Sequence, residues 1–181
     1  MVWGVLSQQG DNTANDISIS DLNGLSVMEY SGADGFYHQF SESLDIRTCF
    51  WVVRRIGGVS FLLGGLDFHS DWHNQNYFKA GFGPPPENLV VKKNGELAQH
   101  IKGYDGNSTI AHFDPSNYQV ISYVNSGVTS ATASSFSSDR GISGRFFQGG
   151  LAELIIFDNQ LSTSDVELVE GYLSAKWGVG D

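Results

Sequence analysis

The chain of 181 residues carries 20 acidic and 10 basic side chains, and its formal net charge of −10 makes nucleic acid and anionic membrane surfaces poor partners. Its length is typical of one domain spanning residues 1–181 with a core of its own, and we expect that domain to be part of a longer protein. The single cysteine, Cys49, excludes an internal disulfide, and no apolar run is long enough to cross a bilayer, so membrane insertion is not expected.

The first third of the chain is predicted to form strands after a polar loop. Gly10 to Ser20 is rich in Asx residues, which indicates a turn-rich loop. The predicted strands cover 25–30, 35–40, 44–54 and 58–63. Over 44–54 the alternation places Ile46 and Phe50 on one face and Trp51 on the other, so both faces are expected to be covered. Cys49 lies in this core strand, where an inert buried thiol is expected.

The rest of the chain continues the series of short strands. Predicted strands cover 77–82, 89–93, 97–103 and 118–124, with one more after Gly127. Asn94-Gly95 predicts a tight type I′ hairpin turn, because both residues accept a positive φ. Glycine pairs also flank several strands and are interpreted as turns; they begin at residues 57, 64 and 149. Many short strands with one helix predict an all-β fold, an antiparallel two-sheet jelly-roll sandwich.

The C-terminal region predicts a closing strand followed by the single short helix. Leu151 to Phe157 is apolar on nearly every residue and is bounded by Gly150, which indicates a strand buried on both faces. Ser162 suits the start of a helix and Gly178 its left-handed end. One apolar stripe along this helix is formed by Val166, Val169, Leu173 and Trp177.

These C-terminal residues resemble a known family. The Gly-Arg-aromatic start at Gly144, the buried strand, the Leu-Ser turn and the ending Tyr172-Leu-Ser-Ala-Lys-Trp-Gly178 are similar to bacterial laminin-G-like domains of the concanavalin A-like lectin and glucanase superfamily. Leu22 to Tyr37 is similar to that family's early hairpin, and Leu44 to Val53 to its long inner strand. The resemblance covers the chain from about Asp21 onward. It implies a module of the kind found in large calcium-dependent bacterial RTX adhesins, located at the cell surface outside the cell.

The segment from Gly64 to Tyr77 is unusually dense in oxygen and nitrogen ligands, and three interpretations of it are open. The favoured one is a Ca²⁺ site, since calcium takes six to eight oxygen ligands and a loop can add backbone carbonyls. The predicted calcium ligands are Asp67, Asp71, Asn76 and Asp105. The second is zinc bound through His69 and His73. The third is a surface loop whose polar side chains bond their own backbone.

Aromatic and polar residues near these ligands are candidates for a binding surface. The predicted ligand-binding residues are His69, Trp72, His73, Tyr77, Tyr104, Asn107 and Arg140. Aromatic rings can stack on sugar faces or hold a peptide, and arginine can form a two-pronged contact with a carboxylate.

A catalytic role is not expected. Retaining glycosidases need two carboxyl groups about 5 to 5.5 Å apart, and the Glu-x-Asp-x-x-Glu motif of the superfamily's glucanases does not occur here. The expected function is therefore noncatalytic, calcium-dependent adhesion by a monomeric domain that binds a peptide or carbohydrate on another cell. A structural spacer and a glycan-active enzyme with an unrecognised site are the alternatives.

Overall fold

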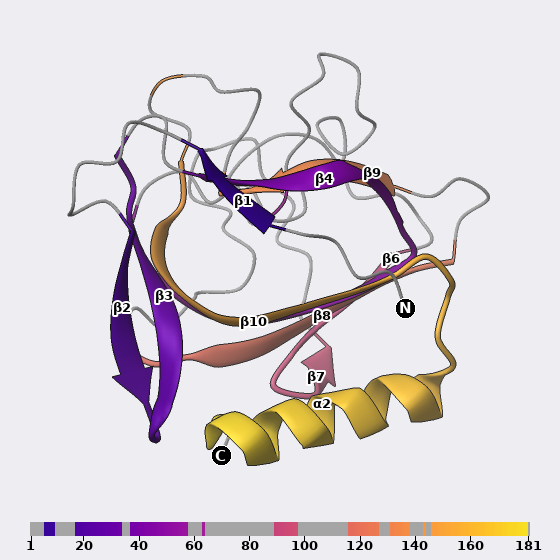
Figure 1. Cartoon of the computed structure of the whole chain (residues 1–181). Coiled ribbons are helices and arrows are strands. Elements are labelled where there is room, and N and C mark those ends of the chain that lie inside the picture. The colour runs from indigo at the N-terminus through magenta and orange to yellow at the C-terminus, as the bar shows by residue number, and fades with distance from the viewer. Residues whose placement is uncertain are drawn as a thin grey trace, which may run out of the picture.

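Two antiparallel sheets face each other, and one helix covers the outer face of the larger sheet (Figure 1). The computed structural model describes residues 6–9, 17–33, 37–57, 63, 89–97, 116–126, 131–137, 143 and 146–180. Within these ranges the chain is mostly antiparallel strand, with the helix at its C-terminal end. This arrangement agrees with the predicted all-β sandwich-like fold with one C-terminal helix.

The larger sheet has seven strands and the smaller one three. The seven strands, in spatial order, are β2 (Ile17–Leu22), β3 (Leu25–Ser31), β10 (Gln148–Phe157), β5 (Thr48–Gly57), β8 (Gln119–Asn125), β6 (Leu89–Lys93) and β7 (Glu96–Leu97). The smaller sheet has the order β1 (Leu6–Gln9), β4 (Tyr37–Ile46) and β9 (Ala131–Phe136). β5 lies between β10 and β8, so strands distant in sequence pair at the centre of the larger sheet.

The predicted continuous strand over 44–54 is wrong, because the chain changes sheets at Arg47. β4 ends at Ile46 in the smaller sheet and β5 begins at Thr48 in the larger one. The Arg47 N–H donates to the Phe157 carbonyl at 2.9 Å, and its carbonyl accepts from the Asn125 N–H at 2.8 Å. Ile46 therefore packs between the sheets, on the opposite side of β5 from the residues with which alternation had grouped it.

The predicted loop over Gly10 to Ser20 is also wrong in its second half, where β2 begins at Ile17. β2 pairs with β3 from Ile17–Tyr30 to Leu22–Leu25, and a tight turn joins them. In that turn Asn23 has φ 52° and Gly24 has φ 79°. Isoleucine and serine alternate from residue 17 with the period of a strand, although Ile19 is itself 68% exposed in this edge strand.

The core between the two sheets is built largely from aromatic rings. Tyr30, Phe136 and Phe147 meet at centroid distances of 5.1 to 5.9 Å in tilted or edge-to-face contacts, which ring quadrupoles favour. Trp51 is fully buried in the same cluster. Cys49 is buried there as a free thiol, as predicted, and burial raises its pKa well above the ordinary value.

The helix α2 (Thr163–Trp177) closes the opposite face of the larger sheet. Its start and end are those predicted: the Ser162 hydroxyl accepts from the Asp165 N–H at 3.2 Å, and Gly178 adopts the left-handed conformation with φ 62°. Buried helix residues are Val166, Glu170, Leu173 and Trp177. The three apolar ones pack on Val27, Phe50, Val52 and Val120 of the sheet. Each large apolar side chain buried in this second core contributes about 1.5–3 kcal/mol.

Candidate functional site

All the residues that the sequence singled out for calcium and ligand binding lie outside the described residues. These are Asp67, His69, Asp71, Trp72, His73, Asn76, Tyr77, Tyr104, Asp105, Asn107 and Arg140. Within the described ranges, no group of three or more His, Cys, Asp or Glu side chains is placed to hold a metal ion. The described part of the chain likewise contains no helix of the length and apolarity that a membrane crossing requires.

Some of the strand ends that border the segments with those predicted residues come together at one end of the seven-stranded sheet. The exception is β6, which follows the segment with residues 67–77 and begins at Leu89, opposite Asn125 at the other end. β5 ends at Gly57, whose partner Gln148 begins β10. β8 begins at Gln119, which pairs with Val53 of β5. β3 ends at Ser31, which pairs with Gln148 from the other side of β10. The described residues before segment 58–62, after segment 98–115 and after residues 144–145 thus meet here, and we call this region the polar end of the sheet.

Two glycines occupy the middle of the polar end. Gly149 and Gly150 lie inside β10, so the interpretation of this pair as a turn, and of Gly150 as the boundary of the strand, is wrong. Gly149 has φ 150°, and a Cβ atom there would overlap the Arg54 carbonyl oxygen. A Cβ atom on Gly150 would overlap the Tyr118 hydroxyl. A side chain at Gly149 is excluded by the backbone of β5, and a side chain at Gly150 is excluded by the Tyr118 ring and hydroxyl.

On the outer face of the polar end, one carboxylate gathers three neighbours. Glu29 Oε1 accepts hydrogen bonds from Ser20 Oγ at 2.8 Å, from Arg54 Nη2 at 2.9 Å and from the Tyr118 hydroxyl at 2.8 Å. We call Ser20, Glu29, Arg54 and Tyr118 the Glu29 cluster. Its members come from β2, β3, β5 and the residue before β8, and the strand register brings them together over Gly150.

The Glu29 cluster is partly desolvated but open to solvent. The Arg54 and Glu29 side chains are 28% and 17% exposed, and the Arg54 guanidinium lies over the Tyr118 ring with 5.4 Å between its Cζ and the centroid. Burial, and then the hydrogen bond to Glu29, raise the pKa of Tyr118 well above its ordinary value, so the phenol stays a hydrogen-bond donor. Arg54 Nε is buried and has no hydrogen-bond partner among the described residues. A buried donor left in this state costs about 1–3 kcal/mol.

On the inner face of the polar end, Tyr30 and His38 connect the two sheets. Tyr30 Oη and His38 Nδ1 lie 2.6 Å apart, with Tyr30 on β3 and His38 on β4. Burial lowers the pKa of His38 and raises that of Tyr30, which favours the neutral form of both groups. Arg55 and Gln119 also face inward here, and burial lowers the pKa of Arg55.

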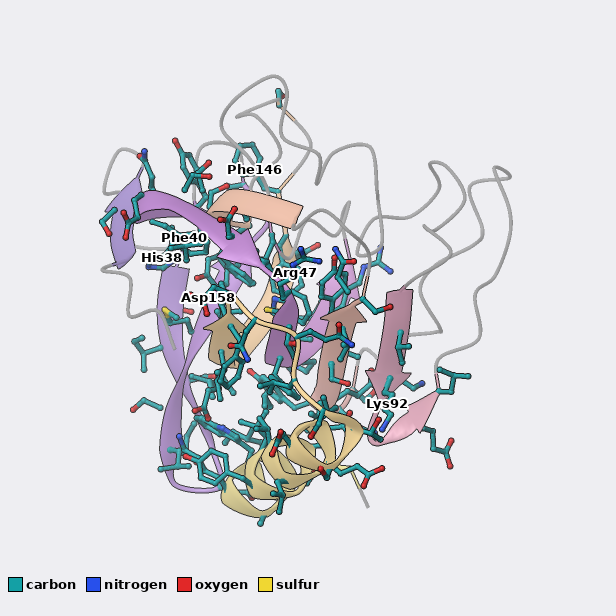
Figure 2. The ribbon with its side chains drawn as sticks, turned by 90° about the vertical axis from the view of Figure 1, so that its right-hand side faces the viewer. His38, Phe40, Arg47, Lys92, Phe146 and Asp158 are labelled. Carbon is teal, nitrogen blue, oxygen red and sulfur yellow. The ribbon has the colours of Figure 1, made fainter. Side chains whose placement is uncertain are left out.

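Two further polar clusters secure the helix rather than form part of the polar end. Glu170 accepts from the Ser122 hydroxyl at 2.5 Å and lies 3.6 Å from Lys92 Nζ, which Figure 2 shows beside α2. At the other end of the helix, Glu153 Oε2 accepts from Trp177 Nε1 at 2.6 Å and from Lys176 Nζ at 2.9 Å. Each cluster joins α2 to a strand, and both are consistent with a structural role.

The Glu29 cluster was not anticipated from the sequence. Glu29 and Arg54 are 25 residues apart, and Glu29 and Tyr118 are 89 apart, so only strand pairing makes them neighbours. One local signal was available: Glu29 is a charged residue within a strand whose neighbours Met28 and Tyr30 pack into the core. Comparisons of the chain with protein-family models, with curated proteins and with solved structures found no match to any of them.

Proposed function

We propose that the chain is a noncatalytic, calcium-dependent ligand-binding module of the concanavalin A-like jelly-roll type, which serves adhesion in a large secreted bacterial surface protein. The observation that carries the proposal is the meeting of strand ends at the polar end of the sheet. Gly57 ends the strand before the segment with Asp67 to Tyr77, Gln119 begins the strand after Tyr104 to Asn107, and Gln148 begins the strand after Arg140. These three strands are adjacent in the sheet. Binding residues typically lie on loops that a rigid scaffold positions, and β5 with its neighbours is such a scaffold.

In this proposal a calcium ion is held by Asp67, Asp71, Asn76 and Asp105 together with backbone carbonyls. A ligand carboxylate or hydroxyl pair completes the calcium shell, because calcium accepts more oxygens than these side chains supply. The ion also reverses the local charge. A chain of net charge −10 repels anionic groups, whereas a bound divalent cation attracts them. Trp72, Tyr77 and Tyr104 provide aromatic surface for a sugar ring or a peptide side chain.

Thermal unfolding with and without calcium tests the metal step. Calcium added after chelation raises the melting temperature, because an ion at one hundred times its Kd stabilises the folded state by about 2.7 kcal/mol. The double substitution Asp67→Asn with Asp71→Asn abolishes this rise. Asp158→Asn, at an exposed aspartate after β10, is the matched control and retains it. If calcium leaves the melting temperature of the unsubstituted chain unchanged, the calcium site is refuted.

The ligand step needs a separate measurement. A glycan array and a peptide library, each screened with calcium and with chelator, identify the ligand class by binding that chelator removes. The double aspartate variant serves as the control for nonspecific retention. Absence of calcium-dependent binding in both libraries would contradict the adhesive function and favour a spacer domain.

A further inference from the structure

The two edges of the seven-stranded sheet are built differently. β7 is an edge of only two residues, and it directly follows the two lysines that end β6. β2 is an edge of six residues, and it forms the outer margin of the sheet in Figure 1. Among the described residues, no strand pairs with the outer side of β2. Because short edge strands and lysines discourage pairing with another chain, β7 is protected in ways that β2 is not.

β2 is a regular and exposed strand. It contains no proline, lysine or arginine, and its register with β3 is continuous, without a bulge. Residues 18–21 are all exposed, and Ile19 is 68% exposed. The one charged side chain, Asp21, accepts a hydrogen bond from the Gly24 N–H at 3.1 Å and is therefore directed toward its own turn. This edge thus presents an apolar residue at its centre and lacks the devices that prevent pairing of edge strands.

The hairpin turn determines which backbone groups of β2 point outward. The two-residue turn between Leu22 and Leu25 makes these two residues a hydrogen-bonded pair, and bonded and non-bonded pairs alternate along an antiparallel ladder. The even-numbered residues of β2 therefore bond to β3. The N–H and C=O groups of the odd-numbered ones, Ile17, Ile19 and Asp21, point away from the sheet. Each of these three residues offers one donor and one acceptor to a further strand.

We propose that β2 pairs in antiparallel fashion with β2 of a second copy of this chain, so that the two larger sheets become one continuous sheet. The two-fold axis passes between the two copies of Ile19, which exchange both backbone hydrogen bonds. Ile17 of each copy pairs in the same way with Asp21 of the other. Ser18 lies opposite Ser20, and hydroxyl side chains form favourable cross-strand pairs.

A second copy is favoured over an unrelated strand because the sequence of β2 complements itself. In this register Asp21 lies opposite Ile17, so like charges do not face each other across the strands. The two copies of Asp21 are about 13 Å apart along the strands, at about 3.3 Å per residue. This separation exceeds the Debye length of about 8 Å at physiological ionic strength. The two copies of Ile19 lie side by side and bury apolar surface that a single copy exposes to water.

The dimer goes beyond the proposed function and does not depend on it. Because the two copies of β2 are antiparallel, the polar ends of the two sheets point in opposite directions. Two ligand sites at these ends, which rest on the proposed function, would face away from each other. Such an arrangement suits a module that joins two surfaces, with each copy bound to one of them.

Sedimentation of the 181-residue chain over a series of concentrations tests the association. We expect the weight-average mass to rise from 19.7 kDa toward twice that mass between roughly 10 µM and 1 mM, the range of weak association. Chelator is present throughout, so that calcium cannot bridge two acidic copies. Each copy has a net charge of −10, so added salt screens their repulsion and increases the dimer fraction.

Amide hydrogen exchange at low and high concentration locates the contact. The amides of Ile19 and Asp21 point outward, and we expect their exchange to slow about tenfold when nine-tenths of the chain is dimeric. The amides of Ser18 and Ser20 bond to β3 and are protected at both concentrations, so they serve as internal controls.

Substitutions at the two edges of the sheet provide matched variants. Ile19→Lys places a lysine at the centre of the β2 edge and weakens the dimer at least about tenfold, because two like charges then lie opposite each other. Leu97→Lys makes an equivalent change at the opposite edge, where Leu97 is 66% exposed, and retains the dimer. Ile19→Pro removes the central outward N–H without removing a bond between β2 and β3, and it also dissociates the dimer.

Three outcomes would overturn the proposal. The first is a chain that stays monomeric at about 1 mM and high salt, a concentration at which even weak dimers are populated. The second is a dimer of unchanged strength in both Ile19 variants when their spectra are those of the folded chain. The third is a dimer in which the Ile19 amide exchanges as fast as in the monomer, or which Leu97→Lys dissociates and Ile19→Lys does not, since the contact then lies elsewhere.

Discussion

Substitution of Gly150 by alanine tests the close contact at the centre of the polar end. Elsewhere in a strand, glycine to alanine would stabilise the protein by about 0.5–1 kcal/mol. Here the added Cβ overlaps the Tyr118 hydroxyl and lies 2.6 Å from its Cζ, so the ring must move. Displacement loses the hydrogen bond to Glu29, about 1.5–3 kcal/mol for a charged acceptor, and strains the packing by about 1–3 kcal/mol. We expect Gly150→Ala to lower the free energy of unfolding by about 2–4 kcal/mol, measured by urea denaturation.

A double-mutant cycle decides whether this mechanism is correct. Tyr118→Ala removes the overlapping ring, so the two substitutions together should cost less than their sum by at least about 1.5 kcal/mol. Gly149→Ala is the matched control, because its Cβ overlaps the backbone carbonyl of Arg54 and truncation of Tyr118 cannot relieve that overlap. Additivity of Gly150→Ala and Tyr118→Ala within about 0.5 kcal/mol would refute the reasoning.

Three other predictions concern buried groups. Burial lowers the pKa of His38, so the folded state binds fewer protons than the unfolded state, and stability is lost as pH falls from about 6.5 toward the folded pKa. We expect His38→Asn to reduce this dependence of the unfolding free energy on pH by up to about 1.4 kcal/mol per pH unit, measured by urea denaturation at several pH values. Glu153→Gln loses the ion pair with Lys176 and weakens the bond from Trp177, for a cost of about 1–2 kcal/mol, whereas Lys176→Met costs below about 1 kcal/mol; the reverse order in denaturant unfolding would contradict this role of Glu153. Cys49 reacts with a thiol reagent only at the rate of unfolding, and fast labelling of the native chain would contradict its burial.

Signals carried by neighbouring residues predicted local structure well. Asn94 and Gly95 have φ values of 50° and 78°, as the expected tight turn requires, and Ser162 and Gly178 begin and end the helix where they were placed. In each case the conformation is set by residues within one turn of the chain. Trp177 faces the sheet for the same reason, since its position in the helical repeat is local.

Tertiary pairing decided the features that the sequence did not predict. Ile46 and Phe50 are both buried apolar residues, and periodicity alone does not show that they belong to different cores. A glycine pair such as Gly149-Gly150 is typical of a turn. Gly150 is instead required within a strand because Tyr118, 32 positions earlier in the chain, packs against it. The predicted calcium and ligand residues lie outside the described ranges and stay predictions. Because the Glu29 cluster is assembled from four separate segments, no local sequence motif predicts it.

The placement of β5 between β10 and β8 has a consequence for the biosynthesis of the chain. Thr48 pairs with Phe157, so β5 cannot pair with β10 until residues about 100 positions later in the chain have been synthesised. At about 5–20 residues per second a ribosome needs roughly 5–20 s to supply it. Pairing over such sequence distances is intrinsically slow, with folding times of milliseconds to seconds in comparable β proteins. During that interval β5 lacks its β10 neighbour, and α2, which covers Phe50 and Val52 on one face of β5, has not yet been made.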